Sequence, residues 1–130
     1  MKPLASFKVF PAGFLYYQVN VWPTKSAMHK HCYWMSGKTY EAACSTYKSS
    51  HYPRCCGEVN LHRRACRPGI IVHELTHAAI GWAERKKLNL SRKPVAGTMP
   101  RDCDEEQFCH AMGSLTAQCF SAMWEYKIWK

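Results

Sequence analysis

The amino-acid sequence predicts one α+β domain, and three observations support this fold class. The chain has 130 residues, enough for a single domain spanning residues 1–130 with one core. Short segments rich in aromatic and β-branched residues occupy its first half, and two long segments with helical spacing of apolar residues follow. Apolar residues make up 47% and charged residues 21%, which excludes disordered, collagen-like and low-complexity chains.

The first half of the chain contains the expected strands. Residues 14–22, FLYYQVNVW, alternate in part and predict a strand that Pro23 ends. Thr24 is a capping residue, and the helix formers after it predict a short helix that continues to about Met35. Residues 40–47, YEAACSTY, predict a second strand.

A third short strand is expected at residues 58–61, EVNL, ahead of the clearest helix. This helix begins near Pro68 and Gly69, because proline is well tolerated in a first helical turn, and it continues to Leu88. Apolar side chains recur along it at helical spacing and form a wide stripe, made of Ile71, Leu75, Ala78, Ala79 and Trp82. We therefore expect a helix that is buried on several sides.

The last predicted helix follows a turn-like connection at residues 89–101. It begins between Asp102 and Glu106, because carboxylates are favoured at the positive end of a helix. Apolar residues again recur at helical spacing, at Phe108, Met112, Leu115, Cys119 and Met123. The order of strands followed by two long helices is typical of α+β domains.

Charge and hydropathy indicate the environment and the partners. Lysine and arginine number 18 against 9 acidic residues, a net charge of +9, which favours contact with an acidic protein or nucleic acid. No apolar run approaches the ~20 residues that span a bilayer, so we expect no membrane partner. Lys8 and Pro11 interrupt the apolar start of the chain, which makes a signal peptide a poor fit. These features predict a cytoplasmic protein, and they leave its oligomeric state open.

The chain has eight cysteines, and without a secretion signal we expect buried thiols or metal ligands rather than disulfides. Cys55, Cys56, His62 and Cys66 have ligand-like spacing but no paired C-x-x-C motif. Whether these four residues bind a second metal ion is left open by the sequence.

The strongest chemical motif is HELTH at residues 73–77, within the first long helix. His73 and His77 are four residues apart, so their imidazoles lie one turn apart and can reach the same zinc ion. Glu74 is rotated by about 100° from His73, which places it beside the metal, where it can take a proton from a bound water. The alternative is a surface helix whose histidines face water, but apolar residues on both sides of the motif disfavour it.

A catalytic zinc ion usually has three protein ligands and a water. The extended HExxHxxGxxH pattern is excluded, because isoleucine and alanine stand where it needs glycine and histidine. Glu105 and Glu106 at the start of the last helix are the candidates for the third ligand. Glu106 is preferred because it shares a helix face with His110 and the small residues Gly113 and Ala117. Alternatively, both carboxylates interact only with the helix dipole.

The order EVNL, GIIVHELTHA and DEEQFCHAMG resembles zincin-like metallopeptidases, most of all the minimal HExxH enzymes with a distal glutamate found in phage and prophage genomes. The resemblance covers about residues 14–123 and implies a small, mostly antiparallel sheet packed on the HExxH helix and a C-terminal helix. It also implies zinc ligation by His73, His77 and Glu106 or Glu105, with Glu74 as general base. By the same resemblance, the EVNL strand is the sheet edge that binds an extended substrate, and a phage-encoded protein acts in the host cytoplasm.

Two functions from different classes therefore follow. The first is a zinc metallopeptidase that hydrolyses peptide bonds of a protein or peptide substrate through a metal-activated water, with Glu74 as general base. The alternative is a zinc-containing, non-catalytic binding or regulatory protein on the same scaffold, associated with nucleic acid through its positive charge.

Overall fold

The computed structural model describes residues 1–32, 41–90 and 103–130. Its elements follow one another as β1 (Ala5–Val9), β2 (Tyr16–Trp22), α1 (Lys25–His31), β3 (Ala42–Thr46), β4 (Cys55–His62), α2 (Pro68–Arg85) and α3 (Asp104–Glu125). A short 3-10 helix, η2 (Arg63–Ala65), joins β4 to α2. The predicted α+β class is confirmed. The predicted connection at residues 89–101 lies almost entirely outside the described residues.

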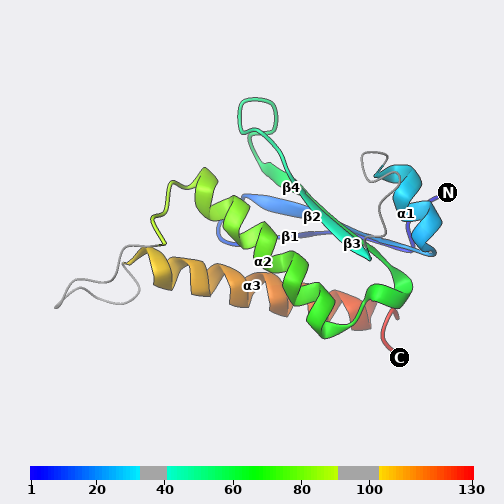
Figure 1. The fold of residues 1–130 in the computed structure, drawn as a ribbon. Coiled ribbons are helices and arrows are strands. Elements are labelled where there is room, and N and C mark those ends of the chain that lie inside the picture. The colour runs from blue at the N-terminus through cyan, green and yellow to red at the C-terminus, as the bar shows by residue number, and fades with distance from the viewer. Residues whose placement is uncertain (33–40, 91–102) are drawn as a thin grey trace.

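The four strands form one sheet in the order β1-β2-β4-β3. The pairs β1–β2 and β3–β4 are antiparallel, whereas β2 and β4 are parallel neighbours. The small, mostly antiparallel sheet is therefore as expected. Helices α2 and α3 both lie on the same face of this sheet and run in opposite directions (Figure 1). None of the helices in the described ranges is long and apolar enough to cross a membrane.

The core lies between the sheet and these two helices. Every residue of the apolar stripe predicted for α2 is buried, from Ile71 to Trp82. In α3, Leu115, Cys119 and Met123 are buried in the same core, while Phe108 and Met112 pack against its border. Burying one such large apolar side chain contributes about 1.5–3 kcal/mol, so the two stripes hold both helices on the sheet.

Helix α1 begins as its sequence predicts. The hydroxyl oxygen of Thr24 accepts a hydrogen bond from the Ala27 backbone N–H at 3.1 Å, which satisfies one of the free donors of the first turn. The helix is shorter than expected and ends at His31, with Cys32 as its C-cap. Residues 33–35, which were predicted to continue it, lie outside the described residues.

Two strand predictions need correction. Strand β1 was not predicted, although its five residues, ASFKV, alternate between apolar and polar side chains. Strand β4 is longer than residues 58–61, and it lies between β2 and β3 instead of at the edge that the resemblance implied. The edges of the sheet are β1 and β3. An alternating pattern predicts a strand but says nothing about which strands pair beside it.

The other face of the sheet carries a polar network centred on Glu58. Its carboxylate accepts a hydrogen bond from the Tyr47 hydroxyl and from the Asn20 amide, at 3.0 Å, and it lies 2.8 Å from His31 Nε2. Asn60, which is fully buried, also contacts this carboxylate and accepts a hydrogen bond from an indole N–H. Burial raises the pKa of Glu58, but the hydrogen bonds from Tyr47 and His31 outweigh burial, and the pKa is lowered.

Candidate metal centre

The two histidines of the HELTH motif converge on the outer surface of α2. The Nε2 atoms of His73 and His77 are 3.3 Å apart, and the His73 side chain is 68% exposed. A tetrahedral zinc ion with bonds of about 2.0–2.1 Å holds two ligand nitrogens about 3.3 Å apart. The separation therefore fits two corners of a zinc site, and it equally fits a hydrogen bond between the two rings.

Glu74, the neighbour of His73 in the sequence, is buried. It is 7% exposed, and its Oε1 atom lies 3.9 Å from His73 Nε2. No hydrogen bond from the described part of the chain reaches this carboxylate. Burial raises its pKa, and the charges of His73 and His77 offset that effect only in part. A carboxylate that is short of hydrogen bonds and close to water-exposed imidazoles is well suited to accept a proton.

The edge strand β3 is the neighbour of Glu74. Burial raises the pKa of the Cys44 thiol on this strand to about 12, and the nearby Glu74 carboxylate adds to the shift. Further along α2, a Cβ atom on Gly81 would lie 2.5 Å from Thr46 Cγ2 and from the Tyr17 hydroxyl, so a larger residue would force these side chains to shift. The candidate site thus lies beside a sheet edge, which no local sequence pattern indicated.

Glu105 and Glu106 lie in the first turn of α3, and the structure does not bring them to the imidazoles. Among the described residues, no three histidine, cysteine or acidic side chains are arranged to hold a metal ion. The antiparallel packing is the physical reason. The Asp104 carboxylate accepts a hydrogen bond from the Asn89 backbone at 2.7 Å, which ties the start of α3 to the chain just beyond α2 (Figure 1). His77 lies about two turns, ~12 Å, before the end of α2.

Glu106 instead contacts His110, one turn further along α3. The distance between its Oε1 atom and His110 Nε2 is 3.3 Å, and the His110 side chain is 71% exposed. This pair shares a helix face, as the sequence predicted. Its contact is within α3, however, and the third zinc ligand remains a prediction.

The sequence left open a second metal site at Cys55, Cys56, His62 and Cys66, and the described residues contain no group of three such side chains that could hold an ion. Cys56 and Cys66 are buried in the core. The His62 ring instead contacts the Glu41 carboxylate at 2.7 Å. No disulfide joins the cysteines of the described residues.

Comparison with protein-family models, with curated protein sequences and with solved structures gives no match. Any functional conclusion therefore rests on the residues and their geometry.

Proposed function

We propose that the protein is a zinc-dependent peptidase in which His73 and His77 hold the ion and Glu74 is the general base. The observation that carries this proposal is the arrangement on α2, where two imidazoles 3.3 Å apart stand next to a buried carboxylate that lacks hydrogen bonds. The pair fits two of the three protein positions of a catalytic zinc site. Glu106 or Glu105 is the predicted third ligand, which requires a different placement of the start of α3.

Bound zinc would supply a more acidic water and a polarised substrate carbonyl. The Glu74 carboxylate would accept the proton of that water and deliver it to the leaving amine. Its raised pKa suits this role, because a base that also acts as an acid works best when its pKa is nearer to neutral pH.

The substrate would bind along β3. This strand is a sheet edge in the described structure and lies beside Glu74. An extended peptide can pair with the backbone N–H and C=O groups of such an edge, so that its bonds run past the catalytic residues. Strand β3 thus takes the role that the sequence resemblance gave to the EVNL strand.

The second candidate is a zinc-containing binding or regulatory protein that does not catalyse a reaction and associates with nucleic acid. Two observations favour it: no third metal ligand joins the imidazole pair among the described residues, and the net charge is +9.

One experiment separates the two functions. Wild type, Glu74→Gln and the control Glu84→Gln, an exposed position on α2, are loaded with zinc and incubated with a mixed peptide library. Cleavage is followed by mass spectrometry, and bound zinc is measured by elemental analysis. We expect Glu74→Gln to keep its zinc and lose about 10²–10⁴-fold in hydrolysis, while Glu84→Gln stays at the wild-type level.

Cleavage by Glu74→Gln at the wild-type rate would refute the assigned role of Glu74. A wild-type protein that binds zinc and cleaves none of the library would instead support the binding function. The zinc affinities of Glu105→Gln and Glu106→Gln identify the third ligand, because loss of a direct ligand should weaken binding more than loss of the neighbouring carboxylate.

A further inference from the structure

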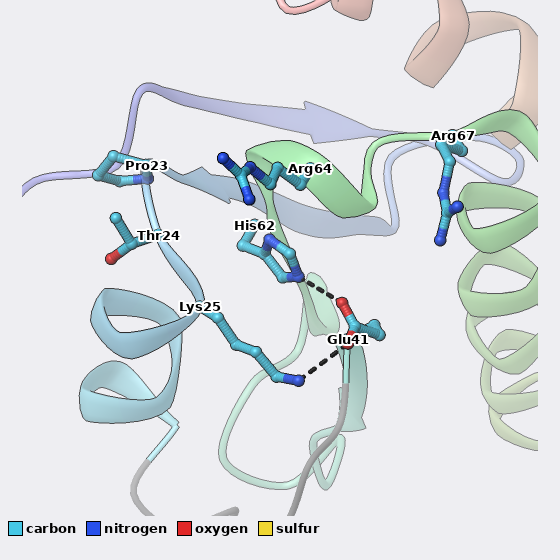
Figure 2. Close-up of a pocket in the computed structure, with 7 residues that line it drawn as sticks. All are labelled: Pro23, Thr24, Lys25, Glu41, His62, Arg64 and Arg67. Atoms are coloured by element: carbon cyan, nitrogen blue, oxygen red, sulfur yellow. Dashed lines mark hydrogen bonds and ion pairs between the residues drawn. The ribbon is translucent and has the colours of Figure 1, made fainter.

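A second candidate site lies at the carboxyl ends of β2 and β4. Because these strands are parallel neighbours, their ends meet at the same edge of the sheet. The segments that follow them line an open pocket of about 730 Å³. We call it the basic pocket, and its polar lining comprises Thr24, Lys25, Glu41, His62, Arg64 and Arg67 (Figure 2). Pockets at the carboxyl ends of parallel strands are common binding sites.

The charged side chains that line the basic pocket are three cations, Lys25, Arg64 and Arg67, and one carboxylate, Glu41. Glu41 bridges Lys25 Nζ, at 2.8 Å, and His62 Nε2, at 2.7 Å (Figure 2). The hydrogen bonds from Lys25 and His62 lower the pKa of Glu41 to about 2, so this carboxylate is charged. Arg64 and Arg67 are exposed, and neither forms an ion pair with a carboxylate in the described ranges. The pocket therefore keeps an excess of positive charge.

The placement of the arginines is unfavourable for the protein alone. Arg67 is the N-cap of α2, and Arg64 lies in the 3-10 helix directly before it. The first turn of α2 contains no acidic residue, and the N-cap side chain makes no capping hydrogen bond. Because the start of a helix carries partial positive charge, cations are disfavoured there and anions are favoured. An anion bound in the basic pocket would reduce this repulsion.

We propose that the basic pocket binds the phosphate group of a small phosphorylated molecule. A guanidinium group donates two parallel hydrogen bonds to phosphate oxygens, and the pocket offers two such groups from adjacent segments. Its volume exceeds what one phosphate ion needs and falls within the range of sites for small organic ligands. The site is independent of the zinc site on α2.

The test is calorimetric titration of the full-length protein with inorganic phosphate, AMP and adenosine. We expect saturable binding of phosphate and AMP with one site per chain, and none of adenosine. The double variant Arg64→Gln, Arg67→Gln should weaken binding by at least about tenfold, because it removes the bidentate donors. The control Lys86→Gln, Lys87→Gln removes the same charge at the exposed far end of α2 and should bind like wild type.

The same titrations show whether the pocket recognises a free phosphate ion or a phosphate group on an organic molecule. Tighter binding of AMP than of inorganic phosphate would assign an organic carrier to the pocket, and equal binding would assign the phosphate group alone. Backbone amide chemical shifts in the NMR spectrum should change at Thr24, Arg64 and Gly69 on titration.

The following results would overturn the proposal. They are absence of saturable phosphate binding, adenosine binding as tight as that of AMP, equal weakening in the control variant, and loss of binding in His73→Ala, His77→Ala. The last result would assign phosphate to the zinc site. Displacement of phosphate by single-stranded DNA that lacks a terminal phosphate, without binding of AMP, would instead identify a nucleic-acid surface.

Discussion

Glu58 on β4 is partly buried and Glu74 on α2 is buried, and their electrostatic environments are opposite. Glu58 receives hydrogen bonds from Tyr47 and Asn20 and contacts His31, and its pKa is lowered. Glu74 has no hydrogen bond from the described residues, and burial raises its pKa. The difference shows that hydrogen-bond donors, rather than burial alone, decide whether a carboxylate is a fixed structural charge or a group that is ready to take a proton.

The largest expected change in the free energy of unfolding tests whether the two imidazoles beside Glu74 bind a metal ion. Zinc at a thousandfold excess over its Kd should raise the free energy of unfolding of wild type by about 4 kcal/mol, because the ion binds only the folded protein. We expect no such increase for His73→Ala, His77→Ala. Thermal unfolding with and without zinc measures the effect.

His51→Ala, an exposed histidine outside the site, is the matched control and should respond to zinc like wild type. Equal stabilisation of the double variant and wild type would place the zinc elsewhere in the chain.

The next largest change in stability is expected when the hydrogen-bonded carboxylate of Glu58 is replaced. Glu58→Gln should lower the free energy of unfolding by about 1–3 kcal/mol, because an amide offers one acceptor oxygen where the carboxylate offers two and brings an N–H₂ group against the donors. Urea denaturation at pH 7 measures this loss, with Glu84→Gln as the exposed control. An unchanged midpoint would mean that the network around Glu58 contributes nothing to stability.

The pH dependence of the Glu58→Gln difference has a defined sign. A carboxylate with a lowered pKa stabilises the fold above its unfolded pKa of about 4.3, and this stabilisation is lost as the pH falls through the folded pKa. The deficit of Glu58→Gln should therefore be greatest at neutral pH and shrink in acid. A deficit that stays constant from pH 7 into acid would show that its cause is packing and not charge.

The smallest change in the free energy of unfolding is expected for Glu74→Gln in the absence of metal. Unlike Glu58→Gln, this substitution should stabilise the protein. Because burial raises the pKa of Glu74, the charged form costs stability as the pH rises above the unfolded pKa, and the full cost remains above the folded pKa. Glu74→Gln should be more stable than wild type at neutral pH, by up to about 1 kcal/mol, and equal to it in acid. Urea denaturation at both pH values checks this, and a less stable variant at neutral pH would contradict the burial argument.

The helices illustrate how far the sequence predicts this fold. The apolar stripe of α2, the cap at Thr24 and the start of α3 depend on residues within a few positions of one another, and all three are confirmed. The helices α1 and α2 end earlier than predicted, at His31 and Arg85. The 3.3 Å approach of His73 and His77 has the same local origin, because helical geometry places side chains four residues apart side by side.

Arrangements that join distant parts of the chain could not be predicted in this way. The strand 58–61 was expected at the sheet edge but lies inside the sheet, and β1 was missed. Glu105 and Glu106 were expected near the imidazoles, but the antiparallel packing of α3 on α2 places the start of α3 at the other end of α2 (Figure 1). The chain fold also brings Arg64 and Arg67 into one pocket with Lys25 and Glu41, which no local sequence pattern predicts.

The sequence by itself therefore determined the α+β class, the long helices and the paired histidines, because helical periodicity and capping act over one or two turns. Only the tertiary structure decided the strand order, the neighbours of Glu74 and the assembly of the basic pocket. These depend on which segments pair across the sheet, and a strand pattern is compatible with several partners.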